Sequence, residues 1–495
     1  MTSSHPLQAL KDPSLFKTQA YVNGQWINGE GTFAVNDPAT GLELAQVANL
    51  NATHAQSAIH AAQQAWAGWR NLTAKERSII LRNWFNLLMA NQEDLARLMT
   101  AENGKPMAET RGEVAYGASF VEWFAEEAKR INGETLPQFD NNRRLMVIRQ
   151  GIGVCAAITP WNFPLAMITR KVAPALAAGC PVVIKPAEQT PLTALACAEL
   201  AQRAGVPAGV LNVLSADGQR SIDIGKVFCS SDTVRHISFT GSTEVGRILM
   251  AQSAPTIKKL ALELGGNAPF IVFDDADIDS AVEGAFASKY RNAGQTCVCS
   301  NRLYVQAGVY DEFVEKFAAK VKTARVGNGF EDGVNQGPLI EPAALDKVER
   351  HVADAIAKGG KVLVGGKRMS SMGSGQFFEP TVVANANASM LCAREETFGP
   401  FAPVFKFETE AEVVAAANAT EYGLASYFYS RDVGRIFRVA EALEYGMVGI
   451  NVGILATEHV PFGGVKQSGL GREGSHHGID DYVEIKYLCL GDILK

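Results

Sequence analysis

Blocks of lysine and arginine are absent from this sequence. Its 46 basic residues are outnumbered by 52 acidic ones, which gives a net charge of −6 at pH 7. Nucleic acids and anionic membrane surfaces attract clusters of basic side chains. We therefore expect neither a nucleic acid nor a membrane as a partner.

Long apolar runs and a disulfide framework are also missing. The most apolar stretch, residues 172–184, contains two prolines and a glycine and is too short to span a bilayer. The first sixteen residues lack the charged, apolar and small-residue order of a signal peptide. Eight cysteines are scattered over 495 residues, which is typical of a protein from a reducing compartment. We expect a cytoplasmic location.

Strands and helices alternate in the middle of the chain. The pattern predicts a parallel sheet covered by helices, of the doubly wound dinucleotide-binding type. The second half repeats it, so we expect a second α/β domain. The predicted elements are strands 153–158, 182–184, 210–214, 234–239 and 361–364 and helices 165–178, 192–204, 243–251 and 309–322.

Short patterns before and after this region predict single elements. An Asn23-Gly24 pair predicts a hairpin within residues 20–27. Thr73 and Glu76 have the spacing of a capping box at the start of a helix over 73–89. Residues 482–490 are strand-like and suited to pairing with the edge of another subunit. Further helices are expected over 52–70 and 113–130.

Cys297 is the candidate nucleophile. A helical pattern ends near Asn292-Ala293-Gly294, because Asn and Gly tolerate the left-handed conformation that terminates helices. Cys297 follows on a loop braced by that helix, which is a common place for a reactive group. A lone cysteine is more often a buried small hydrophobe, so other residues must supply the rest of the reaction.

Polar residues follow several predicted strands. Asn162 lies in a strand-to-helix loop, where its amide can stabilise an oxyanion or simply cap the helix. Lys185 and Glu188 follow the next strand and suit the ribose hydroxyls of an adenosine. Gly241 and Ser242 precede a helix whose N-terminus can bind a pyrophosphate, although the usual glycine motif is missing.

Two carboxylates complete the candidate site. Glu263 precedes a Gly265-Gly266 pair, and an apolar environment there would raise its pKa and make it a general base. A solvated surface glutamate is the alternative. Glu396 and Phe398 offer a second carboxylate and an aromatic ring to a nicotinamide ribose.

Seven motifs occur together over nearly the whole length: ITPWNFP, KPAEQTP, FTGSTEVG, LELGGNAP, GQTCVC, EETFGP and PFGGVKQSGLGRE. With them the chain resembles the NAD(P)-dependent aldehyde dehydrogenases. CVCSNR and GREGSHHGIDDYVEIKYLCLG most resemble the succinate-semialdehyde dehydrogenases, and enzymes acting on glutarate semialdehyde are almost as similar.

The resemblance implies an α/β fold with two doubly wound parallel-sheet domains and a small β arm for oligomerisation. It places a dinucleotide-binding domain at 1–133 and 153–264, a catalytic domain at 265–472, and the arm at 134–152 and 473–495. Members of the family are dimers or tetramers, so a homodimer or homotetramer is expected.

The resemblance also implies a role for each site residue. Cys297 attacks the aldehyde, Asn162 and the backbone N–H of Cys297 hold the oxyanion, and Glu263 activates the water that hydrolyses the thioester. Lys171 and Glu473 match positions suggested to relay protons. The cofactor would contact Thr159, Pro160, Trp161, Lys185, Glu188, Gly241, Ser242, Leu264, Glu396 and Phe398.

Cofactor choice depends on Glu188. Its carboxylate accepts hydrogen bonds from the 2′-hydroxyl of NAD but repels the 2′-phosphate of NADP by about 4 kcal/mol at ~4 Å and an effective dielectric of ~20. Relatives that prefer NADP often carry a small hydroxyl residue at this position. NAD is therefore the expected cofactor, with some use of NADP.

Two arginines determine the expected substrate. Arg170 and Arg291 match the positions that bind the distal carboxylate in the succinate-semialdehyde group, and arginine suits a carboxylate geometrically. The alternative is that one or both pair with structural Asp or Glu. Thr457 replaces the serine that contacts substrate in the family, so the chain length of the semialdehyde stays open.

Cys299 and a histidine pair are secondary candidates. Cys299 lies two residues from the nucleophile and either forms a regulatory disulfide with it or is a spectator thiol. His476 and His477 have Asp480 and Asp481 nearby, but adjacent side chains should diverge, so we expect no metal site. A cysteine hydrolase, a CoA-acylating dehydrogenase and a non-enzymatic binding protein are the rival functions.

Overall fold

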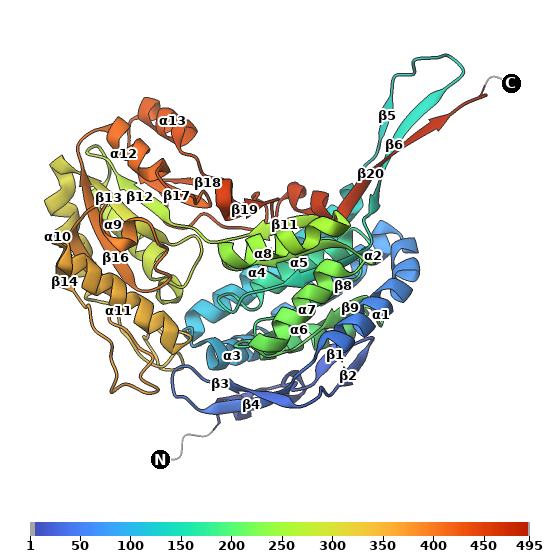
Figure 1. Ribbon diagram of the computed structural model, residues 1–495, viewed down its shortest axis with the longest axis horizontal. Helices are drawn as coiled ribbons and strands as arrows, with labels where there is room; N and C mark the ends of the chain where they lie inside the picture. Colours follow the sequence, from blue (N-terminus) through green and yellow to red (C-terminus); the bar gives the residue numbers. More distant parts are fainter. Residues whose placement is uncertain (1–4, 494–495) are drawn as a thin grey trace.

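The computed structural model describes residues 5–493 and contains two large sheets and an extended strand arm that projects beside the first of them (Figure 1). The first sheet is parallel at its centre, from β11 through β9, and antiparallel at both edges. In spatial order its strands are β19 (Gly469–Leu470), β11 (Lys259–Glu263), β10 (Val234–Thr240), β7 (Val154–Ile158), β8 (Val182–Lys185), β9 (Leu211–Val213), β1 (Ala20–Val22) and β2 (Gln25–Ile27).

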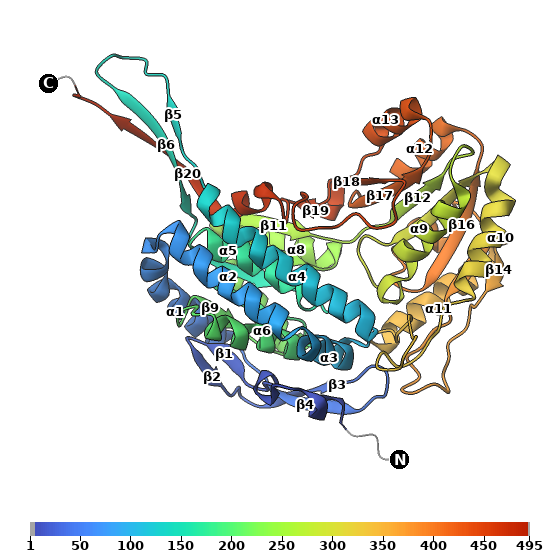
Figure 2. The ribbon, with the colours of Figure 1, turned by 180° about the vertical axis from the view of Figure 1, so that it is seen from behind.

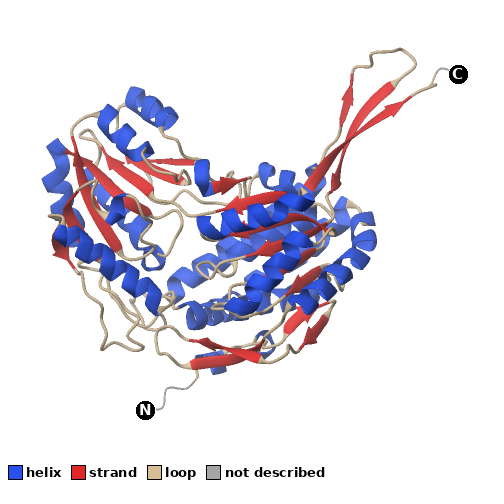
Figure 3. Cartoon of the chain, in the orientation of Figure 1, coloured by secondary structure: helices blue, strands red, loops and turns tan. Residues whose placement is uncertain are grey.

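Helices cover both faces of this sheet (Figure 3). Successive residues of a strand point to opposite faces, so the apolar run of β7 supplies two cores at once. Cys155 and Ala157 face the helices α2 to α6, whereas Val154 and Ala156 face α1, α7 and α8. These helices are α1 (Ala52–Asn71), α2 (Ala74–Ala90), α3 (Gln92–Asn103), α4 (Met107–Glu127), α5 (Ala166–Ala177), α6 (Pro191–Arg203), α7 (Gly218–Ser230) and α8 (Thr243–Ser253).

The second sheet has the same doubly covered design. Phe270 and Val272 of β12 face α9 and α10, and Ile271 faces the helices α11 to α13. In spatial order its strands are β14 (Lys361–Val364), β15 (Thr381–Ala386), β16 (Phe401–Phe407), β13 (Ser300–Gln306), β12 (Ala268–Val272), β17 (Ala425–Tyr429) and β18 (Met447–Ile450). Its helices are α9 (Ile278–Tyr290), α10 (Tyr310–Val321), α11 (Pro342–Ala357), α12 (Glu410–Asn418) and α13 (Val433–Ala442).

A three-stranded antiparallel arm projects from the body (Figures 1 and 2). It consists of β5 (Glu134–Leu136), β6 (Arg144–Gly151) and β20 (Val483–Leu490) and carries apolar side chains into solvent, such as Phe139 and Ile485. A separate antiparallel pair is formed by β3 (Thr32–Asn36) and β4 (Glu43–Ala48). No helix in the described part of the chain is long and apolar enough to cross a membrane.

The α/β fold class is confirmed, and so are several local predictions. The hairpin turns at Asn23 and Gly24, and Thr73 and Glu76 form the capping box. Residues 469–470, assigned to the second domain by the predicted boundaries, pair with β11 of the first sheet. The domain boundaries themselves stay a prediction.

Candidate active site

The loop that carries Cys297 begins where α9 ends. Asn292, Ala293 and Gly294 adopt left-handed conformations in succession, with φ of 51°, 52° and 76°. A Cβ atom on Gly294 would lie 2.2 Å from the carbonyl oxygen of Gly399, so only glycine fits there. The predicted end of the helix is confirmed, and the turn presents Cys297 just before β13.

The Cys297 thiol is half-buried among charged groups. Burial raises the pKa of the thiol to about 12, although the charge of Arg170 acts in the opposite direction. At neutral pH the thiol is therefore protonated in this state, and the thiolate that attacks a carbonyl must be generated during the reaction.

Asn162 lies in the loop between β7 and α5, against the Cys297 loop. Its Nδ2 donates to the carbonyl oxygen of Gln295 at 3.3 Å, and its Oδ1 has no hydrogen-bond partner within residues 5–493. An amide nitrogen has two hydrogens, so one remains free for an oxyanion formed near Cys297. The helix-cap alternative does not apply, because α5 has no side-chain cap of its own.

Glu263 ends β11 and is buried, at 4% exposure. A Cβ on Gly266 would lie 2.6 Å from the carbonyl oxygen of Cys297, so the glycine allows this loop to lie against the nucleophile loop. Burial, reinforced by the Glu473 carboxylate, raises the pKa of Glu263 well above its usual value. The surface alternative is wrong, and a buried carboxylate with a raised pKa suits a general base.

A buried charge cluster lies behind Glu263. Glu473 forms ion pairs with both Lys171 and Arg170, with Arg170 Nη2 at 2.7 Å from Oε2 of Glu473. Burial raises the pKa of Glu473, but the two cations outweigh it and hold that pKa below its usual value. The two proton-relay candidates are thus brought together, 302 positions apart in the sequence.

The two arginines predicted to bind substrate differ in their surroundings. Arg170 is 2% exposed and its Nη2 pairs with Glu473, as one alternative predicted, while its Nε has no hydrogen-bond partner within the described residues. Arg291 is half-buried, lies over the Phe163 ring at 4.7 Å and has no side-chain ion pair or hydrogen bond in residues 5–493. Arg291 therefore has the freer guanidinium of the two.

Thr457 is engaged with its neighbours. Its hydroxyl donates to Glu458 Oε2 at 2.7 Å and lies 3.1 Å from Nδ1 of His459. The loop before it, residues 453–456, lines a small cavity together with Arg291 and Thr296. In this structure the loop, rather than Thr457 itself, lies at the cavity beside Arg291.

Lys185 and Glu188 meet at the carboxyl end of β8. Lys185 Nζ lies 3.5 Å from Glu188 Oε2 and donates to Ser221 Oγ at 2.9 Å. The backbone N–H of Thr159 donates to the Lys185 carbonyl at 3.1 Å, which joins this end to the Asn162 loop. A Cβ on Gly218 would lie 3.3 Å from Glu188 Oε1, so the glycine leaves room around the carboxylate.

The start of α8 fits a diphosphate. Gly241 donates its N–H to the Glu263 carbonyl at 3.0 Å, and a Cβ there would lie 2.4 Å from the Phe239 ring. Ser242 is the N-cap residue of α8, and Leu264 packs against Gly246 on that helix. The N-terminus of α8 thus lies beside the Glu263 loop, where a helix dipole favours negative charge.

An aromatic pair links the two sheets near the same place. The rings of Trp161 and Phe398 are 5.7 Å apart and nearly perpendicular. Glu396 accepts a hydrogen bond from the Gly266 N–H at 3.3 Å, and burial raises the pKa of Glu396 to about 7. Together with the half-buried Pro160, these residues fit a dinucleotide running from the β8 end toward Cys297.

Cys299 is fully buried. Its thiol donates to the Gly294 carbonyl at 3.3 Å, and both Cys297 and Cys299 are free thiols in this structure. A disulfide between them stays a prediction.

The histidine pair is arranged differently from what we expected. The rings of His476 and His477 lie 3.9 Å apart, so the expectation that adjacent side chains diverge is wrong. A short helical turn brings the two rings onto one side of the chain. In residues 5–493 no group of three or more His, Cys, Asp or Glu side chains is placed to hold a metal ion.

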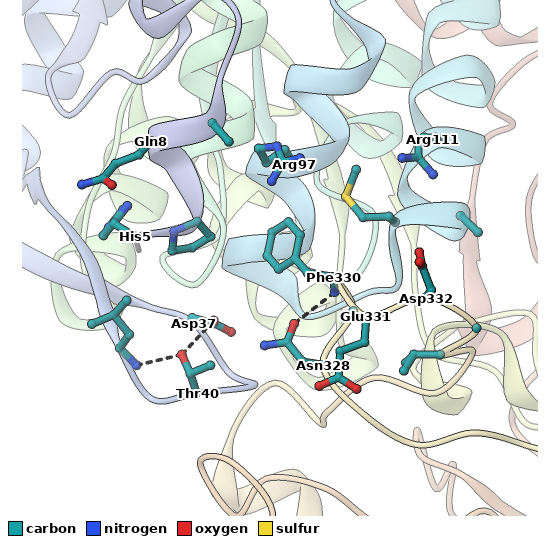
Figure 4. A pocket seen from close by; sticks show the side chains of 18 of the residues that line it. His5, Gln8, Asp37, Thr40, Arg97, Arg111, Asn328, Phe330, Glu331 and Asp332 are labelled. Carbon is teal, nitrogen blue, oxygen red and sulfur yellow. Dashed lines mark hydrogen bonds between the residues drawn. The ribbon is translucent and has the colours of Figure 1, made fainter. Parts of the chain in front are cut away.

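A cavity of about 1020 Å³ lies elsewhere (Figure 4). It is bounded by the N-terminal segment, α3, the start of α4 and residues 328–334, and none of the predicted site residues lines it. Cavity size alone would therefore have pointed away from Cys297.

Three residues of the site escaped prediction. Lys105 and Glu113 form a buried ion pair that contacts the Asn162 loop, and the Asn292 side chain joins that loop to Gln295. The sequence marked Asn292 only as a helix terminator. Nothing in the pattern around Lys105 and Glu113 separates them from an ordinary helix start.

Comparisons with known proteins agree with this geometry. Residues 26–488 match the model of the aldehyde dehydrogenase family. The glutarate-semialdehyde dehydrogenase of Pseudomonas putida strain KT2440 is 60% identical over 97% of this chain and 99% of its own length. The NADP(+) succinate-semialdehyde dehydrogenase of Escherichia coli K12 is 60% identical with the same two coverages.

A solved structure is equally similar. The succinate-semialdehyde dehydrogenase from Burkholderia pseudomallei has a TM-score of 0.96 and 62% identity, covering 98% of this chain and 100% of the other. The fold, the cluster around Cys297 and the full-length similarity lead to one conclusion: this chain belongs to the aldehyde dehydrogenase family.

Proposed function

We propose that this protein oxidises a semialdehyde with a distal carboxylate, succinate semialdehyde before others, to the dicarboxylic acid with NAD(P). One observation carries the proposal: Arg291, whose guanidinium lies over the Phe163 ring and has no ion pair or hydrogen bond within residues 5–493, lies six residues from Cys297, whose loop contacts the Asn162 and Glu263 loops. Glutarate semialdehyde, 2-oxoglutarate semialdehyde or a broad range of aldehydes are the alternatives.

Oxidation begins when the Cys297 sulfur bonds to the aldehyde carbon and the thiol loses its proton to ionised Glu263. The carbonyl oxygen becomes an oxyanion held by Asn162 Nδ2 and the backbone N–H of Cys297. When bound, the nicotinamide accepts the hydride that leaves this carbon. After this first proton has left Glu263, the ionised carboxylate takes a proton from the water that attacks the thioester, the C–S bond breaks with sulfur leaving as a thiolate, and the acid leaves.

Proton release from Glu263 has a route. Glu473 and Lys171 lie behind it as an ion pair, so a proton taken by Glu263 can pass toward this cluster. We infer that the cluster takes a proton from Glu263 after thiol deprotonation and again after hydrolysis of the thioester. Its negative member also keeps Glu263 basic, because the Glu473 charge disfavours a second nearby anion.

Substrate selection rests on the two arginines. Arg291 can offer a whole planar fork to a carboxylate, and within residues 5–493 Arg170 keeps its Nε unpaired beside its contact with Glu473. Hydrogen bonds to charged groups contribute about 1.5–3 kcal/mol each. Two such contacts would strongly favour an acidic aldehyde over a neutral one.

Cofactor selection rests on Glu188. We infer a preference for NAD with some NADP use, because the Glu188 carboxylate lies beside Lys185 at the place of the adenosine ribose. The Escherichia coli relative is named for NADP(+), so the preference differs within the group. The positive charge of the Lys185 ammonium would attract a 2′-phosphate, which is the reason for expecting some NADP use.

The location and assembly follow as proposals too. The projecting arm exposes apolar residues such as Ile485, which suits pairing with a second copy in a homodimer or homotetramer. We infer a cytoplasmic enzyme from the scattered free cysteines.

The first experiment compares kcat/KM with NAD for succinate semialdehyde and for butanal, a neutral aldehyde of equal carbon count. A preference of about 100-fold or more, equivalent to about 2.7 kcal/mol, is expected if the arginines bind the carboxylate. Glutarate semialdehyde in the same assay tests chain length. Equal rates for butanal would leave a general aldehyde dehydrogenase and remove the carboxylate site.

A further inference from the structure

Asn292 makes a closed ring of hydrogen bonds with Asn162. The Asn292 Nδ2 donates to the backbone carbonyl of Asn162 at 3.1 Å and to the carbonyl of Gln295 at 3.2 Å. The Asn162 side chain donates to the same Gln295 oxygen at 3.3 Å. The Asn292 amide therefore donates both to the backbone carbonyl of Asn162 and to the Gln295 carbonyl, which also accepts from the Asn162 side chain.

A charged frame from the start of α4 holds this ring in place. Lys105 Nζ donates to the Asn162 carbonyl at 2.7 Å and forms a buried ion pair with Glu113. Glu109, one turn before Glu113 on the same helix, accepts the Asn292 backbone N–H at 2.9 Å. The frame thus contacts both loops of the site.

Glu113 also fixes the helix that follows Asn162. Its Oε1 accepts the backbone N–H groups of Leu165 and Ala166 at 3.0 and 3.3 Å, at the start of α5. Because α5 has no cap of its own, Glu113 supplies one from another helix. The Asn162 loop is therefore held at the Asn162 carbonyl and again where the chain enters α5.

We propose that Asn292, held by Glu109 and the Lys105–Glu113 pair, is a positioning residue that orients the Asn162 amide toward the oxyanion. One N–H of that amide is fixed on Gln295, so the direction of the other is set by the ring. An oxyanion donor acts over a range of about 2.7–3.1 Å, and a small rotation of the amide would take it out of reach. The inference rests on the proposed aldehyde oxidation.

The test is a double-mutant cycle between Asn292→Gly and Asn162→Ala. Glycine keeps the left-handed backbone at position 292 and removes only the amide. Single-turnover NADH formation from succinate semialdehyde is measured at saturating NAD. Asn292→Gly should slow it by about 10- to 100-fold, with little change in KM.

The double variant distinguishes positioning from general structural damage. If Asn292 acts through Asn162, the double variant should be within about twofold of Asn162→Ala alone. Alkylation of Cys297 by iodoacetamide, which forms no oxyanion, should stay within about twofold of the wild-type rate. Additive effects, or a loss of alkylation as large as the loss of turnover, would overturn the proposal.

A second pair of variants keeps the test open if Asn292→Gly does not fold. Glu109→Gln retains an acceptor for the Asn292 N–H and Glu109→Ala removes it, so the alanine variant should lose more activity than the glutamine variant. Equal losses would contradict the frame. A wild-type protein that forms no NADH from any aldehyde would instead remove the proposed function.

Discussion

Charged side chains cluster in two regions of this molecule, and the regions differ in whether the polar atoms there have hydrogen-bond partners. In the large cavity of Figure 4, Arg111 pairs with Glu93 through two hydrogen bonds, and Asp37 accepts from the Ala39 N–H and the Thr40 hydroxyl. Around Cys297, buried atoms of Asn162, Arg170 and Glu263 lack hydrogen-bond partners within the described residues. Each unsatisfied buried polar group calls for an explanation, and around Cys297 a bound substrate would supply one.

The strongest test removes the nucleophile. Cys297→Ala should lower kcat by at least about 10⁴-fold, because no other group can form the thioester. NAD should still bind, measured by the change in intrinsic protein fluorescence on titration. Retained turnover would show that Cys297 is one more buried thiol and would break the contrast between the two regions.

Removing the base should have the next largest effect. Glu263→Gln should lower steady-state turnover by about 10²- to 10⁴-fold and should also slow the first turnover of NADH, because Glu263 takes the thiol proton as well as the proton of the attacking water. The raised pKa of Glu263 gives the sign of the pH dependence: the ionised base forms as pH rises, so kcat of the wild type should increase with pH. A wild-type kcat that falls as pH rises would contradict the assignment.

Substitutions of Arg291 and Arg170 should distinguish a loss of activity from a loss of stability. Arg291→Met should lower kcat/KM for succinate semialdehyde by about 100-fold and leave butanal unchanged, because within residues 5–493 Arg291 has no ion pair or hydrogen bond to lose, only its contact with the Phe163 ring. Arg170→Met should also destabilise the fold, since it leaves Glu473 with one cation fewer in a buried site, a loss of about 3–5 kcal/mol. Urea unfolding of both variants measures the difference.

Local features could be predicted from the sequence, and long-range pairings could not. The hairpin at Asn23, the capping box at Thr73 and the helix end at Asn292 depend on neighbouring residues, so the pattern indicated them. The ion pair of Arg170 with Glu473 joins residues far apart in the chain, and no spacing rule contains it.

The limits of the site prediction have the same cause. The motifs placed Asn162, Glu263 and Cys297 in one reaction, but the Lys105–Glu113 pair that supports them resembles any helix start in the sequence. Likewise, the turn that stacks the His476 ring on the His477 ring overrode the rule for neighbouring side chains in an extended chain.

A smaller effect is expected at the adenosine end. Glu188→Ser should raise kcat/KM with NADP by about tenfold, because it removes a carboxylate that repels the 2′-phosphate while Lys185 remains. NAD efficiency should fall in the same variant, since the ribose loses an acceptor. The ratio of the two efficiencies is the measurement. An unchanged ratio would mean that Glu188 does not face the ribose.

The smallest effect belongs to the large cavity. Arg111→Ala removes a cation that is 47% exposed and paired with Glu93, so stability should change by less than about 1 kcal/mol. Because Arg111 lies outside the Cys297 cluster, kcat and KM for succinate semialdehyde should stay within about twofold. Arg291→Met, by contrast, is expected to cost about 100-fold in kcat/KM. If Arg111→Ala reduced turnover as much, the cavity would be coupled to the reaction. The presence or absence of hydrogen-bond partners would then not distinguish the two regions.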